Sequence, residues 1–260
     1  MKKINLGLQI YSVREAFIDD PVGTLKRIAT MGYEGVELNF GALEEDFQVY
    51  KNALDEYNLS CFGAVVSWHY LQPDTLSDTL KGLTALGTNN FIIGSVNPSL
   101  ILSEPDYPKK AVDYMNTLYE SLSKEGFHIG YHNHAFDFES QYDGKSLYEY
   151  IIENTPDNFM MVLDTGNAQA GGGNPLELVR KFPNRTPIMH LKGYSSAQQL
   201  LAPVWDSDTD WETLIDEVLM VGGARILDIE FGTRGDYEPF ERAEQSLNWL
   251  KNKLNNIKNS

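Results

Sequence analysis

Four short segments in the second half of the chain contain residues that can bind a metal or transfer a proton. In each segment these residues follow an apolar run. The segments are IGYHNH with His132 and His134, MVLDTGN with Asp164, PIMHLKG with His190 and Lys192, and ILDIEFG with Asp228 and Glu230. Such side chains are costly to bury unless they are paired or bind a metal. A single histidine, or a single Asp before Thr-Gly, is more often structural, for example as a helix cap. Four such segments in succession instead favour a functional site.

The spacing inside these segments predicts that their polar side chains point together, because strand residues two apart share a face. The pairs that share a face are His132 with His134, His190 with Lys192, and Asp228 with Glu230. Two imidazoles and two carboxylates form a ligand set suited to Mn²⁺, Co²⁺, Zn²⁺ or Fe²⁺, whereas the imidazoles argue against Ca²⁺ and make Mg²⁺ less natural. We therefore expect a divalent metal, with Mn²⁺ favoured.

The elements that position these residues are short β-branched or aromatic runs that alternate with segments of helical periodicity. The predicted strands are Ile4 to Tyr11, Tyr33 to Leu38, Ser60 to Val66, Asn90 to Gly94, Phe127 to His132, Phe159 to Leu163, Pro187 to Lys192 and Arg225 to Phe231. Apolar stripes at helical spacing lie in residues 22–29, 47–57, 76–86, 112–122, 147–151, 176–179, 214–221 and 240–257. In GGGNP, Asn174 is expected to cap the sixth helix and Pro175 to begin it.

Eight strand and helix pairs, repeated at a mean spacing of about thirty residues, predict a (β/α)8 TIM barrel. No linker divides the chain, so residues 1–260 are expected to form a single domain. In such barrels function lies at the carboxyl ends of the strands, where the polar clusters occur. The long polar loop from Gly193 to Asp210 is either a binding loop or simple surface elaboration.

The amino-acid composition indicates which kinds of partner the protein can bind and in which compartment of the cell it works. The chain has 21 basic and 37 acidic residues, a net charge of −16, which repels phosphate backbones and anionic membranes. It has one cysteine, Cys61, and no run of apolar residues long enough for a signal peptide core or a membrane span. We therefore expect a cytoplasmic protein with no nucleic acid and no membrane as partners.

Six segments resemble one known family. They are LGLQIYSVR, GYEGVEL, GYHNHAFDF, VLDTGNAQAGG, HLKGY and DIEFG. Together they are similar to the xylose isomerase-like TIM barrels, the superfamily of sugar phosphate isomerases and epimerases, over essentially the whole chain. The YHNH pattern, followed by Asp137 and Phe138, resembles one subgroup of it. Because many relatives are dimers or tetramers, the resemblance suggests a homodimer or homotetramer.

The resemblance implies a divalent metal held at the ends of strands five to eight. Asp164, His190 and Glu230 match three of the family's four ligands. His132 stands where the family has its first glutamate, and Asn167 stands where several members have histidine. The implied metal ligands are therefore His132, Asp164, His190 and Glu230.

The implied chemistry is removal of the proton next to a carbonyl, with the metal stabilising the enediolate. Ketose epimerisation and aldose–ketose isomerisation share this step. Family epimerases use two glutamates on opposite faces of the substrate, and only Glu230 remains here. His134 and Lys192 are the candidates for the second acid–base group. A keto-sugar lyase or dehydratase, of the 3-keto-glycoside lyase or inosose dehydratase type, is the alternative, since elimination needs only one strong base.

Further residues are candidates for substrate binding. Gln9 and Tyr11, expected on one face of the first strand, are candidates for sugar hydroxyls, and Trp68 and His69 for an aromatic wall and a donor. The resemblance places Glu37 as a substrate- or base-orienting carboxylate, against an equal chance of a strand-end ion pair. Arg234 is the candidate for an anionic group. No Gly-rich phosphate cradle is visible, which slightly favours a non-phosphorylated sugar.

Two other classes fit less well. An AP endonuclease of the same superfamily needs more metal ligands than five histidines allow, and a cationic face for DNA. A non-catalytic sugar-binding barrel has no need of an Asp, a His and a Glu converging on a metal. The sequence therefore favours a metal-dependent enzyme acting on a small sugar.

Overall fold

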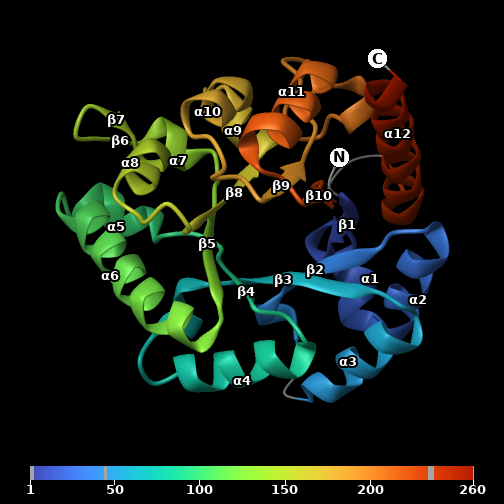
Figure 1. The fold of residues 1–260 in the computed structure, drawn as a ribbon, viewed down its shortest axis with the longest axis horizontal. Coiled ribbons are helices and arrows are strands. Elements are labelled where there is room, and N and C mark those ends of the chain that lie inside the picture. Colours follow the sequence, from blue (N-terminus) through green and yellow to red (C-terminus); the bar gives the residue numbers. More distant parts are fainter. Residues whose placement is uncertain (1–2, 44–45, 234–236, 260) are drawn as a thin grey trace.

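The strands form one closed parallel barrel in the computed structural model, which describes residues 3–43, 46–233 and 237–259. The order around the barrel is β1, β10, β9, β8, β5, β4, β3, β2. The strands are β1 (Asn5–Gln9), β2 (Gly35–Asn39), β3 (Ser60–Val66), β4 (Asn90–Ile93), β5 (His128–His132), β8 (Met160–Asp164), β9 (Ile188–Leu191) and β10 (Ile226–Ile229). Figure 1 shows them in the centre of the molecule, and β1 pairs with β10 to close the ring.

Helices surround the barrel (Figure 1). They are α1 (Arg14–Asp19), α2 (Pro21–Met31), α3 (Phe47–Glu56), α4 (Leu76–Leu86), α5 (Pro98–Ser103), α6 (Tyr107–Leu122), α7 (Phe136–Glu139), α8 (Leu147–Glu153), α9 (Thr165–Ala170), α10 (Pro175–Lys181), α11 (Trp211–Glu217) and α12 (Pro239–Asn259). A π-helical turn, Val218–Gly222, extends α11. A small hairpin of β6 (Gln141–Tyr142) and β7 (Lys145–Ser146) lies outside the barrel.

Local sequence signals explain where these helices begin and end. The Asp20 carboxylate accepts the backbone N–H of Gly23, Pro21 occupies the first turn of α2, and Gly32 ends this helix with φ of 92°. Asn174 caps α10 through the N–H groups of Leu176 and Glu177, which confirms the predicted cap. Side-chain caps thus begin both of these crossover helices.

The predicted barrel is confirmed, with local corrections. The first strand ends at Gln9, not at Tyr11, because residues Ile10–Val13 turn into a 3-10 helix. Helix α9, which follows β8 without a linker, was not expected. In the long loop, Ser196 and Asp208 hydrogen-bond to each other, and a 3-10 helix forms over Val204–Asp206. This loop is therefore folded upon itself.

The register brings the polar residues of neighbouring strands to the same level. Asp164 on β8 pairs with His190 on β9, which in turn pairs with Asp228 on β10. On the other side of Asp228 lies Gly7 of β1. A Cβ atom at Gly7 would sit 1.6 Å from Asp228 Oδ1, so only glycine leaves room for this carboxyl group.

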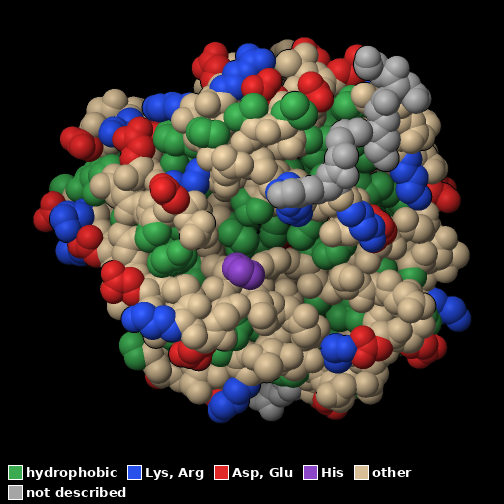
Figure 2. Space-filling model, viewed as in Figure 1, with side chains coloured by type: hydrophobic (Ala, Val, Ile, Leu, Met, Phe, Trp, Pro, Cys, Tyr) green, Lys and Arg blue, Asp and Glu red, His purple; other side chains and the backbone are tan. Residues whose placement is uncertain are grey.

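The surface carries mixed charges. Figure 2 shows hydrophobic side chains near the centre of one face, with acidic and basic side chains scattered around them. Within the described residues, no helix is both long and apolar enough to cross a bilayer.

Candidate metal centre

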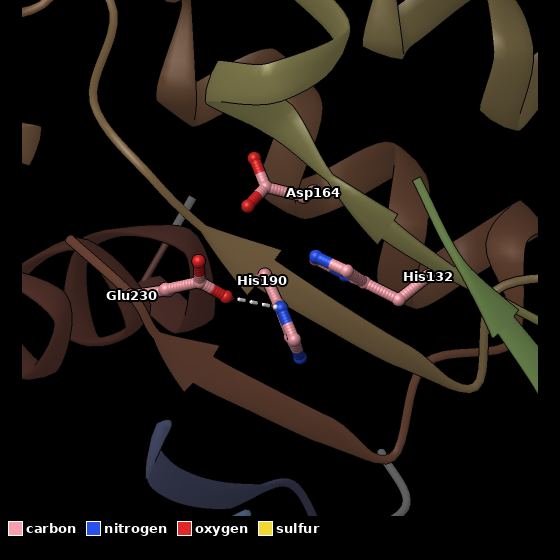
Figure 3. A group of neighbouring side chains, drawn as sticks. All are labelled: His132, Asp164, His190 and Glu230. Carbon is pink, nitrogen blue, oxygen red and sulfur yellow. Dashed lines mark ion pairs between the residues drawn. The ribbon is translucent and has the colours of Figure 1, made fainter. Parts of the chain in front are cut away.

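Four side chains from consecutive barrel strands converge inside the carboxyl end of the barrel (Figure 3). They are His132 of β5, Asp164 of β8, His190 of β9 and Glu230, which directly follows β10. One ligand atom of each lies within 4.8 Å of the others, and all four residues are buried. The structure thus brings together the four residues expected to bind the metal.

An asparagine fixes the distance between the first two of these strands. The Asn133 amide donates from Nδ2 to the carbonyl oxygen of Asp164 over 3.0 Å and accepts the Asp164 N–H over 2.8 Å. Asn167 donates in turn to the carbonyl oxygen of Asn133. Asn133 is fully buried, so these bonds form without competition from water.

Asp164 has two roles, one for each carboxylate oxygen. Oδ1 accepts the N–H of Asn167 at 2.7 Å and thereby caps α9. Oδ2 is buried without a hydrogen-bond partner and lies 3.5 Å from Lys192 Nζ. Burial raises the pKa of Asp164 to about 6, against the opposing effect of the Lys192 ammonium. The structural interpretation, a helix cap, is therefore confirmed, and metal binding by Asp164 stays a prediction.

His190 lies between two carboxylates. Its Nδ1 is 2.7 Å from Glu230 Oε2, and its Nε2 is 2.9 Å from Glu37 Oε1. Burial alone would lower the pKa of His190, but Glu37 and Glu230 outweigh it and hold this pKa well above the usual value. Without a metal the imidazole therefore carries a proton on each nitrogen.

Lys192 neutralises part of the negative charge of the site. Its Nζ donates to Glu230 Oε1 over 2.8 Å, and only 7% of the residue is exposed. Burial raises the pKa of Glu230, but the Lys192 ammonium and His190 outweigh this effect and hold the pKa well below the usual range. The carboxylate is thus ionised and weakly basic.

The two histidines of the YHNH segment are neutral. Burial lowers the pKa of His132 well below 6.5 and also lowers that of His134. Their rings lie 4.9 Å apart, and the Nδ1 atom of each is buried without a partner. A neutral imidazole offers a lone pair, which can bind a metal or accept a proton.

The residues present fit a divalent cation. Nδ1 of His132 and Oδ2 of Asp164 are buried polar atoms that no described protein group satisfies with a hydrogen bond. Buried polar atoms without a hydrogen-bond partner are uncommon in folded proteins unless a water or an ion binds to them. Metal ligands must be deprotonated, so the neutral His132 is already in its binding form, whereas a cation would displace the proton on Nδ1 of His190.

The other predicted site residues lie in different surroundings. Gln9 is buried, and its side-chain carbonyl accepts the N–H of Tyr11 instead of facing solvent. Glu37 is fully buried behind His190. Trp68 is half-buried against Tyr114, with ring centroids 5.8 Å apart, and His69 is exposed. Arg234 lies outside the described residues.

Sequence reasoning named Asn133 and the buried Asp137 only as members of the YHNH pattern and assigned them no role. Asp137 accepts the N–H of His134 and the Tyr131 hydroxyl, and burial raises its pKa to about 7. Both residues lie inside the segment that drew attention for its histidines. Their position in that segment was the signal that could have pointed to them, but their hydrogen-bond partners are known only from the fold.

Comparison with known proteins agrees with this geometry. The family model described as "Xylose isomerase-like TIM barrel" matches residues 25–253. No curated protein matches the chain in sequence.

Solved structures share the fold. A sugar phosphate isomerase/epimerase from Parabacteroides distasonis superposes with a TM-score of 0.77 at 19% identity, over 95% of this chain and 97% of that one. For 3-keto-D-glucoside 4-epimerase from E. coli the TM-score is 0.70 at 15% identity, over 96% and 100%. For D-allulose 3-epimerase from Methylomonas sp., in complex with D-allulose, it is 0.68 at 14% identity, over 97% and 98%. The chain belongs to the xylose isomerase-like TIM barrel family.

Proposed function

We propose that this protein is a divalent-metal-dependent sugar isomerase or epimerase. It removes the proton next to the carbonyl of a ketose or keto-sugar and returns it at a new position or on the other face. The observation that carries this proposal is the buried set of two imidazoles and two carboxylates at the strand ends, in which Nδ1 of His132 and Oδ2 of Asp164 have no hydrogen-bond partner among the described residues.

The residues that would hold the metal are His132, Asp164, His190 and Glu230. When bound there, a divalent cation supplies a Lewis acid that polarises the substrate carbonyl. Mixed nitrogen and oxygen ligands favour Mn²⁺, with Co²⁺, Zn²⁺, Fe²⁺ or Mg²⁺ as the other candidates.

Three side chains are proposed to handle the proton. Glu230 is the expected base, although its contacts with Lys192 and His190 make it weakly basic. His134 is neutral, lies beside His132 and has an unpaired Nδ1, so it fits the second acid–base group. Lys192 holds Glu230 ionised and is the third candidate for proton transfer.

A small sugar is the proposed substrate. The epimerases of D-allulose and of 3-keto-D-glucoside share this fold, which supports a sugar ligand. Trp68, His69 and Tyr11 are the proposed contacts to it, since each has an exposed or half-buried side chain beyond the strand ends.

Elimination is the second candidate reaction, because His132 occupies the position where family epimerases have their first glutamate. A substrate deprotonated by a single base can lose a substituent from the next carbon instead of regaining its proton. A 3-keto-glycoside lyase or an inosose dehydratase would work in this way. Product analysis separates the two, since elimination releases an unsaturated sugar and a leaving group.

Metal analysis tests the site itself. Protein stripped with EDTA, reloaded with Mn²⁺ and dialysed is expected to hold one metal per chain, and Asp164→Ala is expected to hold much less. Asp113→Ala is the matched control, because it removes one exposed carboxylate far from the site. Full metal occupancy in Asp164→Ala would show that these residues are not the ligands.

A further inference from the structure

Glu37 is a charged residue whose place in the barrel does not suit contact with substrate. It lies on β2, across the barrel from β9, and its side chain has no exposure to solvent. Its carboxylate faces His190, at 2.9 Å from Nε2.

The two nitrogens of His190 face different groups. Nδ1 is turned toward Glu230 and the metal-binding cluster, and Nε2 is turned toward Glu37. A neutral imidazole carries one N–H and one lone pair. Once a cation displaces the proton from Nδ1, a proton held on Nε2 by an acceptor keeps the lone pair on Nδ1, facing the cluster.

Two residues lie close to the Glu37 carboxylate, His190 and Asp228, and the three together could also hold a cation. Among the described residues, His190 is the only group that forms an ion pair with Glu37. Asp228 lies near both residues but forms no ion pair with His190 among the described residues, and its oxygens, like those of Glu37, have no well-aligned hydrogen-bond donor. Burying a carboxylate for stability alone is unfavourable, since a hydrophobic side chain would serve as well or better.

We infer that Glu37 is the positioning residue of His190: it accepts the Nε2–H and so holds the ring with the Nδ1 lone pair directed at the metal. This inference rests on the metal site of the proposed function. It differs from the expected substrate- or base-orienting role and gives a function to the alternative, an ion pair, which the contact with His190 shows. Carboxylates that accept the second N–H of a metal-binding histidine typically account for 10- to 100-fold in metal affinity or activity.

The test compares three variants of the full chain. Glu37→Leu removes the acceptor, and Glu37→Gln keeps an uncharged acceptor of the same shape. Asp228→Asn is the matched control, because it changes the buried carboxyl group that lies near His190 and Glu37 but, among the described residues, forms no ion pair with His190. The readouts are the Kd for Mn²⁺ by titration calorimetry and, in metal-free ¹⁵N-labelled protein, the Nε2–H resonance of His190.

Wild-type protein is expected to show a downfield, slowly exchanging Nε2–H resonance, because this proton is buried and bonded to a carboxylate. In Glu37→Leu this resonance should be lost and the Kd for Mn²⁺ should rise by about 10- to 100-fold. In Glu37→Gln the resonance should shift upfield and the Kd should rise by a smaller factor. Asp228→Asn should leave both readouts near the wild-type values.

The inference is overturned if both Glu37 variants bind Mn²⁺ as tightly as wild type and keep the Nε2–H resonance unchanged. If Glu37→Leu does not fold, Glu37→Gln decides the question through the same two readouts. A wild-type protein that binds no Mn²⁺ would instead contradict the proposed function. The Nε2–H resonance then still decides whether Glu37 orients His190.

Discussion

Glu230 joins the two cationic side chains of the site, with one carboxylate oxygen on His190 and the other on Lys192. We expect Glu230→Gln to fold normally and to lose at least about a hundredfold in the rate of substrate deprotonation, the usual worth of general-base catalysis. The amide keeps the shape of the carboxylate but cannot accept the proton. Exchange of the substrate α-hydrogen with D₂O, at saturating Mn²⁺, measures this rate.

Metal content is the control for that experiment, since Glu230 is also a proposed ligand. A Glu230→Gln protein that holds Mn²⁺ and exchanges at nearly the wild-type rate would remove Glu230 from the role of base.

The lowered pKa of His134 leads to a prediction for how the rate of the reaction depends on pH. Burial lowers its pKa below the usual 6.5, so its imidazole is neutral at pH 7 and becomes protonated as the pH falls through that lowered value. A protonated imidazole cannot accept a proton, so the exchange rate should fall on an acidic limb that lies below pH 6.5. His134→Ala should lose turnover, retain its metal and lack this limb.

If His134→Ala at saturating metal still shows the acidic limb of the pH–rate profile, another group is responsible for that limb. His69→Ala is a suitable control, because His69 is exposed and belongs to a different loop.

At the scale of single residues, the sequence predicts which four side chains meet at the strand ends but not their supporting contacts. His132, Asp164, His190 and Glu230 could be identified because each ends a strand, and topology places the ends of parallel strands together. His190 could not be identified as the partner of Glu37, because the two residues lie on strands that are more than a hundred residues apart in the chain.

At the scale of elements, Asn133 connects β5 to β8 by hydrogen bonds to both backbone polar groups of Asp164. Asn133→Ala leaves that N–H and C=O buried without partners, at a cost of about 1–3 kcal/mol for each unsatisfied group. We expect the free energy of unfolding in urea to fall by about 2–4 kcal/mol. Mn²⁺ binding should weaken as well, because the same bonds set the spacing of His132 and Asp164.

Asn116→Ala is the comparison for that measurement, since Asn116 makes one bond at the surface, to the carbonyl oxygen of Asn154. Equal destabilisation by the two substitutions would show that Asn133 does not join the strands in the way described.

Periodicity and caps predict most of the elements, and the exceptions have physical reasons. The eight strands follow from β-branched runs between helical segments, and α10 follows from Asn174 and Pro175. Helix α9 could not be separated from β8, because Asp164 both ends the strand and caps the helix. The β6–β7 hairpin does carry a sequence signal, the Asp143–Gly144 pair, because Asp-Gly favours the tight turn in which both residues have positive φ.

At the scale of the whole molecule, metal binding should stabilise the barrel, because its ligands come from four strands that must be in place together. Mn²⁺ at a hundred times its Kd should raise the free energy of unfolding by about 2.7 kcal/mol. Thermal unfolding with and without Mn²⁺, in wild type and in Asp164→Ala, measures this effect. An equal upward shift in both proteins would place the binding elsewhere on this acidic chain.

The central claim, that the protein removes a proton next to a carbonyl with the help of a metal, is tested most directly by hydrogen exchange. EDTA-stripped protein is incubated in D₂O with D-allulose, D-fructose or a 3-keto-glucoside, with and without Mn²⁺, and followed by ¹H NMR. The account predicts loss of the α-hydrogen signal of at least one sugar only when Mn²⁺ is present. No exchange with any of these sugars in Mn²⁺-loaded protein, or equal exchange in its absence, would contradict it.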